Sequence, residues 1–130
     1  MPIVEFSNED ILRSKIVDPA WYRVRIDSVD EGMSKAGDST NYRISGTILR
    51  NADDGSDKFS NVPAPLWIFN SKAKGFMVGF FESLGGEVAP GARFDFANAV
   101  GKEIDVFIEN EMYEGRMVNR INHKYRAPRT

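Results

Sequence analysis

The sequence predicts a mainly β protein with five short strands and one helix, which lies between the third and fourth strands. Several segments alternate apolar and polar residues, which is typical of half-buried strands. Residues 76–84 instead repeat apolar residues at three- and four-residue steps, which is typical of an amphipathic helix. The chain has 130 residues, 42% of them hydrophobic, which is enough to bury one core but not two. We therefore expect one domain.

The first 20 residues are expected to form an arm or a short helix ahead of the strands. Ser7 is a candidate N-cap because Asp10 follows three residues later, and the segment stops near Pro19. The main domain is expected over residues 21–126, with a short tail at residues 127–130.

The first strand is expected over residues 21–29. Charged side chains are rarely fully buried, so the apolar face should point to the core and the arginines to solvent. The expected inner residues are Tyr22, Val24 and Ile26, and the outer ones are Arg23 and Arg25. A loop with turn chemistry follows at residues 31–40.

The second strand is expected over residues 41–49, and an acidic hairpin at residues 51–60 links it to the third. Its expected inner residues are Tyr42, Ile44, Gly46 and Ile48, and its outer ones are Arg43, Ser45 and Thr47. The third strand, residues 65–70, is apolar on both faces, so two orientations stay open. Either Leu66 and Ile68 or Trp67 and Phe69 look inward.

The helix is expected to be capped by Asn70 or Ser71 and to end at Gly85 and Gly86. The fourth strand is expected over residues 101–110 and the fifth over residues 116–121, after a turn at residues 111–115. Five strands with a helix between the third and fourth match the five-stranded Greek-key barrel called the OB-fold, whose strand 2 and 3 face binds oligonucleotides or oligosaccharides.

Catalytic and cofactor sites find little support in the residue types. Cysteine is absent and His123 is the only histidine, which excludes cysteine nucleophiles and multi-histidine metal sites. Glycine pairs follow the helix and do not open one, so no phosphate-cradling loop is expected. A metal-dependent nuclease is the one catalytic alternative, and it would rest on Asp105, Glu109 and Glu111. We expect no enzyme activity, no cofactor and no metal.

The sequence also bears on location. No apolar run approaches the ~20 residues of a membrane span, and the N-terminus lacks the basic-then-apolar order of a signal peptide. We expect a cytoplasmic protein that does not contact a membrane.

Charge and aromatic residues point to a nucleic-acid surface. The net charge of -2 argues mildly against such a surface, but residues 116–130 contain no acidic residue. This segment is therefore expected to form either a basic surface on an otherwise acidic protein or a solvated tail. Cations can follow phosphates while aromatic rings stack on bases. The candidate binding residues are Trp21, Arg23, Arg25, Lys35, Arg43, Trp67, Phe69, Lys72, Tyr113, Arg116, Arg120 and Lys124. Whether Trp67 and Phe69 line the groove or the core stays open.

The order of several short motifs resembles a family of bacteriophage single-stranded DNA-binding proteins of OB fold. These motifs are Trp21–Ile26, Ser34–Gly37, Phe80–Gly85, Val100–Glu103, and Tyr113–Arg116 followed by Asn119. The resemblance implies sequence-tolerant binding that protects single-stranded DNA in phage replication or recombination, in the cytoplasm of the host. Replication or recombination proteins are implied as possible partners. The chain ends Arg-Ala-Pro-Arg-Thr, and not in an acidic partner-recruiting tip.

A second hypothesis is a non-catalytic protein-interaction or virion-associated β-barrel, with exposed apolar groups such as Phe107 making the contacts. Self-association into a homo-oligomer is compatible with both hypotheses. They differ in whether the protein binds oligonucleotides in a salt-sensitive way.

Overall fold

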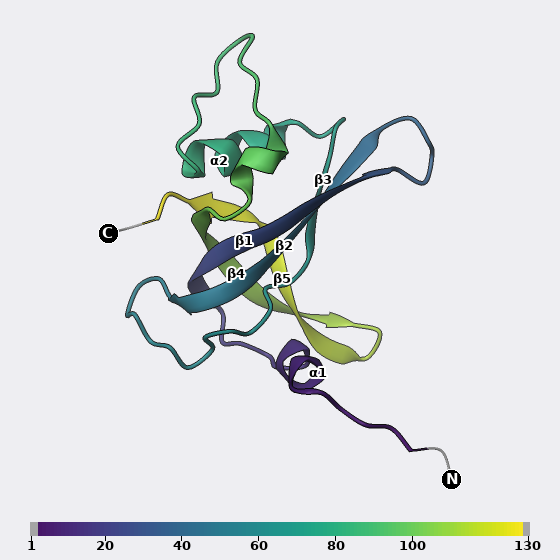
Figure 1. The fold of residues 1–130 in the computed structure, drawn as a ribbon, viewed down its shortest axis with the longest axis vertical. Coiled ribbons are helices and arrows are strands. Elements are labelled where there is room, and N and C mark those ends of the chain that lie inside the picture. Colours follow the sequence, from purple (N-terminus) through teal and green to yellow (C-terminus); the bar gives the residue numbers. More distant parts are fainter. Residues whose placement is uncertain (1–2, 129–130) are drawn as a thin grey trace.

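A computed structural model describes residues 3–128 as a mainly β fold (Figure 1). The strands are β1 (Ala20–Met33), β2 (Thr40–Asn51), β3 (Trp67–Asn70), β4 (Glu103–Tyr113) and β5 (Arg116–Arg126). The helices are α1 (Asn8–Arg13), α2 (Gly75–Ser83) and a short 3₁₀ helix, η1 (Phe96–Ala99). The expected order of three strands, a helix and two strands is confirmed. Residues 1–2 of the expected arm and 129–130 of the expected tail lie outside the described residues.

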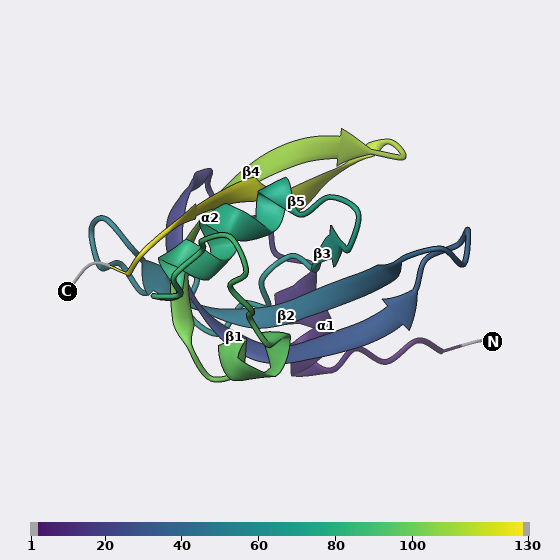
Figure 2. The ribbon, with the colours of Figure 1, turned by 90° about the horizontal axis from the view of Figure 1, so that it is seen from above.

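The strands form one antiparallel sheet in the order β3-β2-β1-β4-β5. Strand β1 pairs with β4 through residues 20–25 and with β2 along residues 22–33, so it links the two halves of the sheet. Two irregularities in the β1–β2 register add curvature. The sheet curls around the core, with β1 and β2 on one side and β4 and β5 on the other (Figure 2), but its edges, β3 and β5, are not joined.

The core confirms the inward faces expected for β1 and β2, and the alternating apolar residues of β4 also point inward. Val24, Ile26, Ile44, Ile48 and Ile104 are fully buried. Strand β3 places Trp67 and Phe69 inside and leaves Leu66 and Ile68 exposed, which decides the orientation that the sequence left open.

Two local signals at the N-terminus act as expected. The Ser7 hydroxyl accepts the amide N–H of Asp10, and the Asp10 carboxylate accepts that of Ser7. This reciprocal pair is a capping box, and it fixes the start of α1.

Helix α2 begins later than expected and has no side-chain cap. Asn70 accepts the amide of Lys72 and Ser71 accepts that of Thr40, so both candidate caps serve the β3–α2 connection. The helix ends as expected, because the amide of Gly85 bonds to Glu82 and that of Gly86 to Phe81, which is the Schellman pattern. Its buried residues Met77 and Phe80 close one end of the core.

Strand β5 runs to Arg126, so most of the basic terminal segment is paired strand and not a frayed tail. The turn before it is a two-residue loop, Glu114–Gly115, in which both residues have positive φ (48° and 81°). That geometry is the hairpin turn that matches strand twist. None of the helices within residues 3–128 has the length and apolar character needed to cross a bilayer.

Candidate functional site

A groove of about 790 Å³ crosses the outer face of β2. One wall is the chain that leads into β3, the other is the start of β5, and the linker between α1 and β1 closes one end. Residues on the floor and walls are Asp27, Asp30, Arg43, Ser45, Gly46, Thr47, Pro63, Ala64, Pro65, Leu66, Arg116, Met117, Val118 and Asn119, with Ser14 and Ile16 at the end. The expected outer face of β2 therefore forms the floor of this groove.

Two cations in this groove are free to meet a ligand. Arg43 on β2 and Arg116 on β5 are both exposed, and neither has an ion-pair partner among residues 3–128. They come from strands at different positions in the sheet, so the groove joins two predicted binding residues that are far apart in the chain. A guanidinium pair of this kind can hold phosphate oxygens.

The groove also contains two carboxylates. Asp30 lies opposite Arg43 in the β1–β2 register and is exposed. Burial raises the pKa of Asp27, but hydrogen bonds from the Thr47 hydroxyl and from Arg25 Nε (2.9 Å) outweigh it and hold that pKa below its ordinary value. Asp27 is therefore ionised at neutral pH and satisfied by the protein, whereas Asp30 faces solvent.

Apolar side chains stand beside the two arginines. Leu66 is 54% exposed, Met117 44% and Tyr113, at the end of the β4–β5 hairpin, 52%. The guanidinium of Arg120 lies 5.3 Å from the Tyr113 ring centre. Among the aromatic residues predicted to stack on bases, Tyr113 is thus the one with a largely exposed ring.

The prediction that Trp67 and Phe69 stack on bases is not supported by their placement. Trp67 is 3% exposed and Phe69 1%. The Phe69 ring centre lies 4.9 Å from that of Phe80, and Trp67 meets Phe80 edge to face at 6.5 Å. Both rings belong to the core because α2 covers them on the inner side of β3.

The expectation that Arg23 lies on the solvent face is wrong. Arg23 is 7% exposed, and its Nε donates to Asp105, which is fully buried. Arg126 Nε lies 3.3 Å from the other oxygen of Asp105, and Nη2 of the same guanidinium pairs with Asp53. The outer face of β1 and β4 is covered here by an ion cluster, so Arg23 supports the fold and Asp105 is its buried partner.

Several other predicted cations already have acidic partners. Arg25 pairs with Asp27, Lys72 with Asp38, and Lys124 with Glu109. Arg120 Nε lies 3.2 Å from Glu111, close enough for an ion pair but not aligned as a hydrogen bond. Lys35 is exposed in the β1–β2 loop, with no ion-pair partner in the described part of the chain. The charge of β5 is therefore largely neutralised by its neighbour β4.

Trp21 lies outside the groove. Its ring meets Phe107 edge to face at 5.5 Å, and the guanidinium of Arg126 lies 4.4 Å above it. The ammonium nitrogen of Lys124 lies 5.3 Å from the centre of the Phe107 ring. Trp21 is thus part of a cation–π stack on β1, β4 and β5.

The placement of the acidic residues does not support the metal-dependent nuclease. Asp105 is enclosed by two arginines, and Glu109 is held by Asn122 and Lys124. Residues 3–128 contain no group of three or more acidic or histidine side chains placed to hold a metal ion.

The groove also contains residues that were not among the predicted binding residues. Asn119 accepts the amide of Val17 and donates to the carbonyl of Lys15, which fixes the α1–β1 linker against β5. Pro63 forms an isolated bridge to Thr47. The alternation of Arg43, Ser45 and Thr47 was the available signal for the floor, but the walls depend on long-range contacts that have no local pattern.

No family model matches this chain, and no curated protein is significantly similar to it in sequence.

Proposed function

We propose that the protein is a non-catalytic, sequence-tolerant single-stranded DNA-binding protein that holds the strand in the groove across β2. The observation that carries the proposal is the pair Arg43 and Arg116, two exposed cations without ion-pair partners among the described residues, on the floor and one wall of a groove of about 790 Å³. Cations that track phosphates supply most of the affinity for nucleic acid.

The sheet order and the helix between β3 and β4 support an OB-type barrel. In that partly open five-stranded barrel the ligand lies across strands 2 and 3, and here β1 pairs with both β2 and β4, so the sheet curves in the same sense. The groove occupies this face, and the chain that enters β3 forms one of its walls.

The groove favours single strands over duplex. Leu66, Met117 and Tyr113 present exposed apolar and aromatic surface beside the arginines. An unpaired strand can place base faces on such surface, whereas the bases of a duplex are already stacked. With the resemblance of its motifs to phage single-stranded DNA-binding proteins, this supports a role in phage replication or recombination in the host cytoplasm.

The test is the binding of a fluorescent oligothymidine of about 30 nucleotides, longer than the roughly 4 to 16 that one OB barrel covers. Fluorescence anisotropy at several salt concentrations gives the affinity and its salt dependence. Arg43→Gln/Arg116→Gln should weaken binding and reduce the slope of log K against log salt by about 1.4, since each single-strand phosphate contact contributes about 0.7. Lys102→Gln removes one exposed cation outside the groove and should leave the slope unchanged, so it is the control for loss of charge elsewhere on the surface.

Two outcomes would contradict the proposal. One is the absence of salt-sensitive binding by the parent protein at low salt. The other is equal binding by the double variant and the parent. Competition by the matching duplex with equal strength would remove the single-strand preference.

A protein-interaction barrel is the second candidate, and one observation favours it. Met112, Tyr113 and Met117 are 65%, 52% and 44% exposed on the β4–β5 hairpin. A cluster of exposed apolar side chains at a hairpin tip is typical of a contact surface. This function predicts tight partner association without oligonucleotide affinity.

A further inference from the structure

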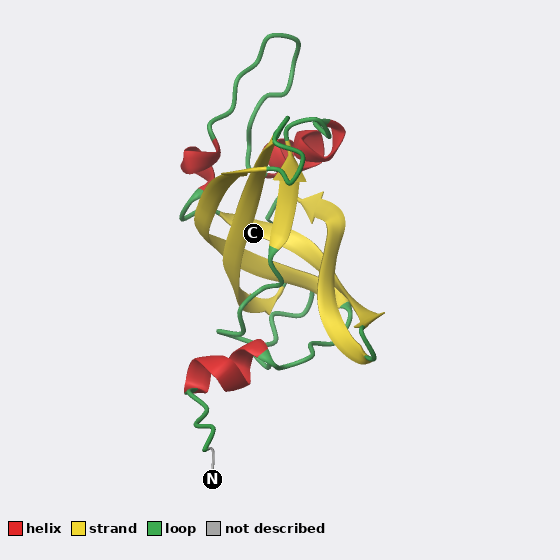
Figure 3. Ribbon diagram, turned by 90° about the vertical axis from the view of Figure 1, so that its right-hand side faces the viewer, coloured by secondary structure: helices red, strands yellow, loops and turns green. Residues whose placement is uncertain are grey.

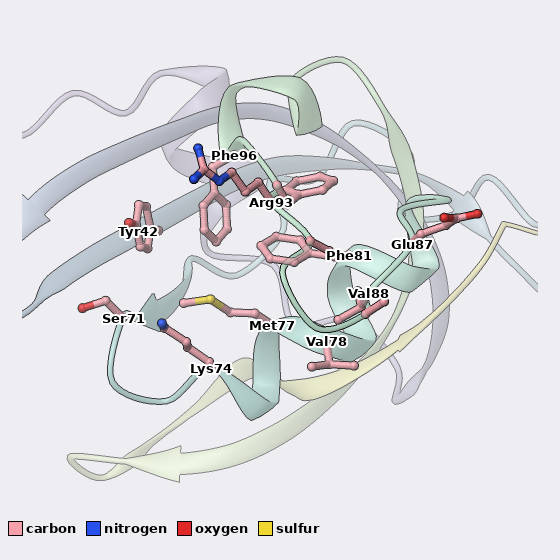
Figure 4. A pocket seen from close by; sticks show the side chains of 13 residues that line it. Tyr42, Ser71, Lys74, Met77, Val78, Phe81, Glu87, Val88, Arg93 and Phe96 are labelled. Atoms are coloured by element: carbon pink, nitrogen blue, oxygen red, sulfur yellow. The ribbon is translucent and has the colours of Figure 1, made fainter.

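A second cavity lies at the α2 end of the molecule, away from the groove. It has a volume of about 310 Å³ and is bounded by α2, by the chain between α2 and η1, and by Tyr42 of β2 (Figure 4). Its lining is mostly apolar and includes Met77, Val78, Phe81, Val88, Phe94 and Phe96. A cavity of roughly 150 Å³ holds a benzene ring, so this one accommodates a phenylalanine side chain with an aliphatic neighbour.

The charges of this cavity favour an anionic ligand. Lys74, which directly precedes α2, and Arg93 on the chain before η1 both line it (Figure 4), and neither has an ion-pair partner among residues 3–128. Glu87 also lines the cavity, so the local balance is one excess positive charge. The matching ligand is an apolar group that carries a carboxylate nearby.

A nucleobase fits this cavity less well than an apolar side chain. Phe81 is stacked on Phe94, with ring centres 4.0 Å apart, and Tyr42 on Phe96 at 4.2 Å. Each of these four rings therefore already has one face covered by another ring. Base binding by stacking needs a free ring face, whereas an inserted side chain needs only apolar walls.

The chain itself carries a segment with the required chemistry. Residues 3–7 precede α1 without secondary structure and extend away from the body (Figure 3). In this arm Ile3 is 90% exposed, Val4 74% and Phe6 70%, and Glu5 is the acid between them. Burial of these three large apolar side chains against another surface would be favourable in free energy.

The arm and the cavity lie at opposite ends of the long axis of the molecule, with α1 at one end and α2 at the other (Figure 1). Residues 3–7 reach at most roughly 18 Å beyond α1 even when extended. We infer that the arm of one copy inserts Phe6 into the α2-side cavity of a second copy, with Glu5 facing Lys74 and Arg93. Such a contact joins two different surfaces, so it repeats head to tail and builds a ring or an open chain of several copies, depending on the rotation between neighbours.

Sedimentation velocity of the full-length protein over a range of concentrations tests this inference. The parent should form oligomers that grow with concentration. Phe6→Ser, in the arm, and Val88→Asp/Arg93→Glu, in the cavity, should each weaken association by about tenfold or more, because each removes buried apolar area or a matched charge. Met33→Ser is the matched control, since Met33 is 77% exposed on the β1–β2 hairpin, outside both surfaces.

Mixing the two variants gives the sharpest result. The arm variant keeps an intact cavity and the cavity variant keeps an intact arm, so an equimolar mixture should form a one-to-one dimer that does not grow. All of these side chains are exposed, and circular dichroism spectra that match the parent would show that each variant is folded.

Three outcomes would overturn the inference. They are a monomeric parent at every concentration, oligomers that persist in Phe6→Ser, and variants that do not pair when mixed. A monomeric parent whose oligothymidine affinity falls with Arg93→Glu would instead assign the cavity to nucleic acid. The inference does not depend on the function proposed for the groove, because association is measured without DNA and the Arg43 and Arg116 variants are separate.

Discussion

The indole of Trp67 is a core group, and its removal should act on stability. Trp67→Ala should reduce the free energy of unfolding by about 3 to 5 kcal/mol, the usual cost of truncating a large buried ring. Trp67→Phe should cost much less, because the buried indole N–H has no hydrogen-bond partner among residues 3–128, so its loss leaves nothing unpaired. Urea denaturation gives both values. A Trp67→Ala protein that is as stable as the parent but binds oligothymidine more weakly would place the ring in the binding site after all.

His123 should make stability depend on pH near neutrality. Its ring stacks on Phe76, with centres 4.4 Å apart, and lies 5.2 Å from Phe69, and this burial lowers its pKa below the ordinary 6.5. The unfolded state then binds the proton more readily than the folded state. Its contribution is therefore fully present above pH 6.5 and is lost as the pH falls through that value towards the lower folded pKa.

Urea denaturation between about pH 5 and pH 7.5 measures this effect. The free energy of unfolding should rise with pH in that window for the parent and should be flatter for His123→Asn, in which the asparagine suits the positive φ of 55°. The carboxyl groups of Asp27, Asp38 and Glu109 have lowered pKa values and titrate below this window. An equal slope in both proteins would contradict the assignment.

The residues whose environment could be predicted are those set by local alternation. Tyr22, Val24 and Ile26 face the core as their period requires. Alternation predicts which face of a strand Arg23 occupies, but not whether another element covers that face. The Arg23 side chain is covered by Asp105, which lies 82 residues later in the chain, and by Arg126. Such a pairing depends on strand order, which no local pattern contains.

The β1–β2 pair depends on close contact at Gly46, opposite Ile26. A Cβ atom there would lie 2.6 Å from Val24 Cγ1 and 2.8 Å from the carbonyl oxygen of Arg25. Gly46→Ala should therefore destabilise the protein by about 1 to 3 kcal/mol through overpacking. Gly32→Ala, at an open position of the same hairpin, should be neutral or slightly stabilising. Thermal unfolding of both variants tests the difference, and equal melting temperatures would refute the close contact.

Removing one charge from the ion cluster that joins β1, β4 and β5 should lower the free energy of unfolding strongly. Replacing the buried ion pair with two apolar residues should lower it much less. Asp105→Asn leaves Arg23 and Arg126 with one carboxylate fewer in a buried site, which should cost about 3 to 5 kcal/mol. Arg23→Met/Asp105→Leu should recover most of that loss, because it removes the buried pair together. Neither variant should change the salt dependence of oligothymidine binding. If Arg23 contacted phosphate, the variant that lacks Arg23 would reduce that dependence. Urea denaturation and anisotropy measure the two effects separately.

The positions of the strands along the chain and the end of α2 were predictable because each has a local cause, which is the period of two for the strands and the Gly85–Gly86 pair for the end of the helix. The start of α2 was not, since Asn70 and Ser71 bond within the β3–α2 connection and to the start of β2 instead. The length of β5 was also missed. Its last residues pair with β4 across a register shift, and only that pairing reveals them as strand.

The whole chain carries a net charge of -2, so any affinity for DNA must come from how charges are distributed. Most cations of β5 are paired with acids of β4, which leaves the groove as a local site. Arg43 and Arg116 there stand against Asp30, which is exposed and repels phosphate. The proposed function therefore predicts that Asp30→Asn strengthens oligothymidine binding by roughly two- to fivefold at low salt, an effect that added salt should screen. Asp57→Asn, on the β2–β3 loop outside the groove, makes the same change in net charge. If binding follows the groove, anisotropy will separate the two variants, and if it follows net charge alone, both will bind equally and the groove assignment will fail.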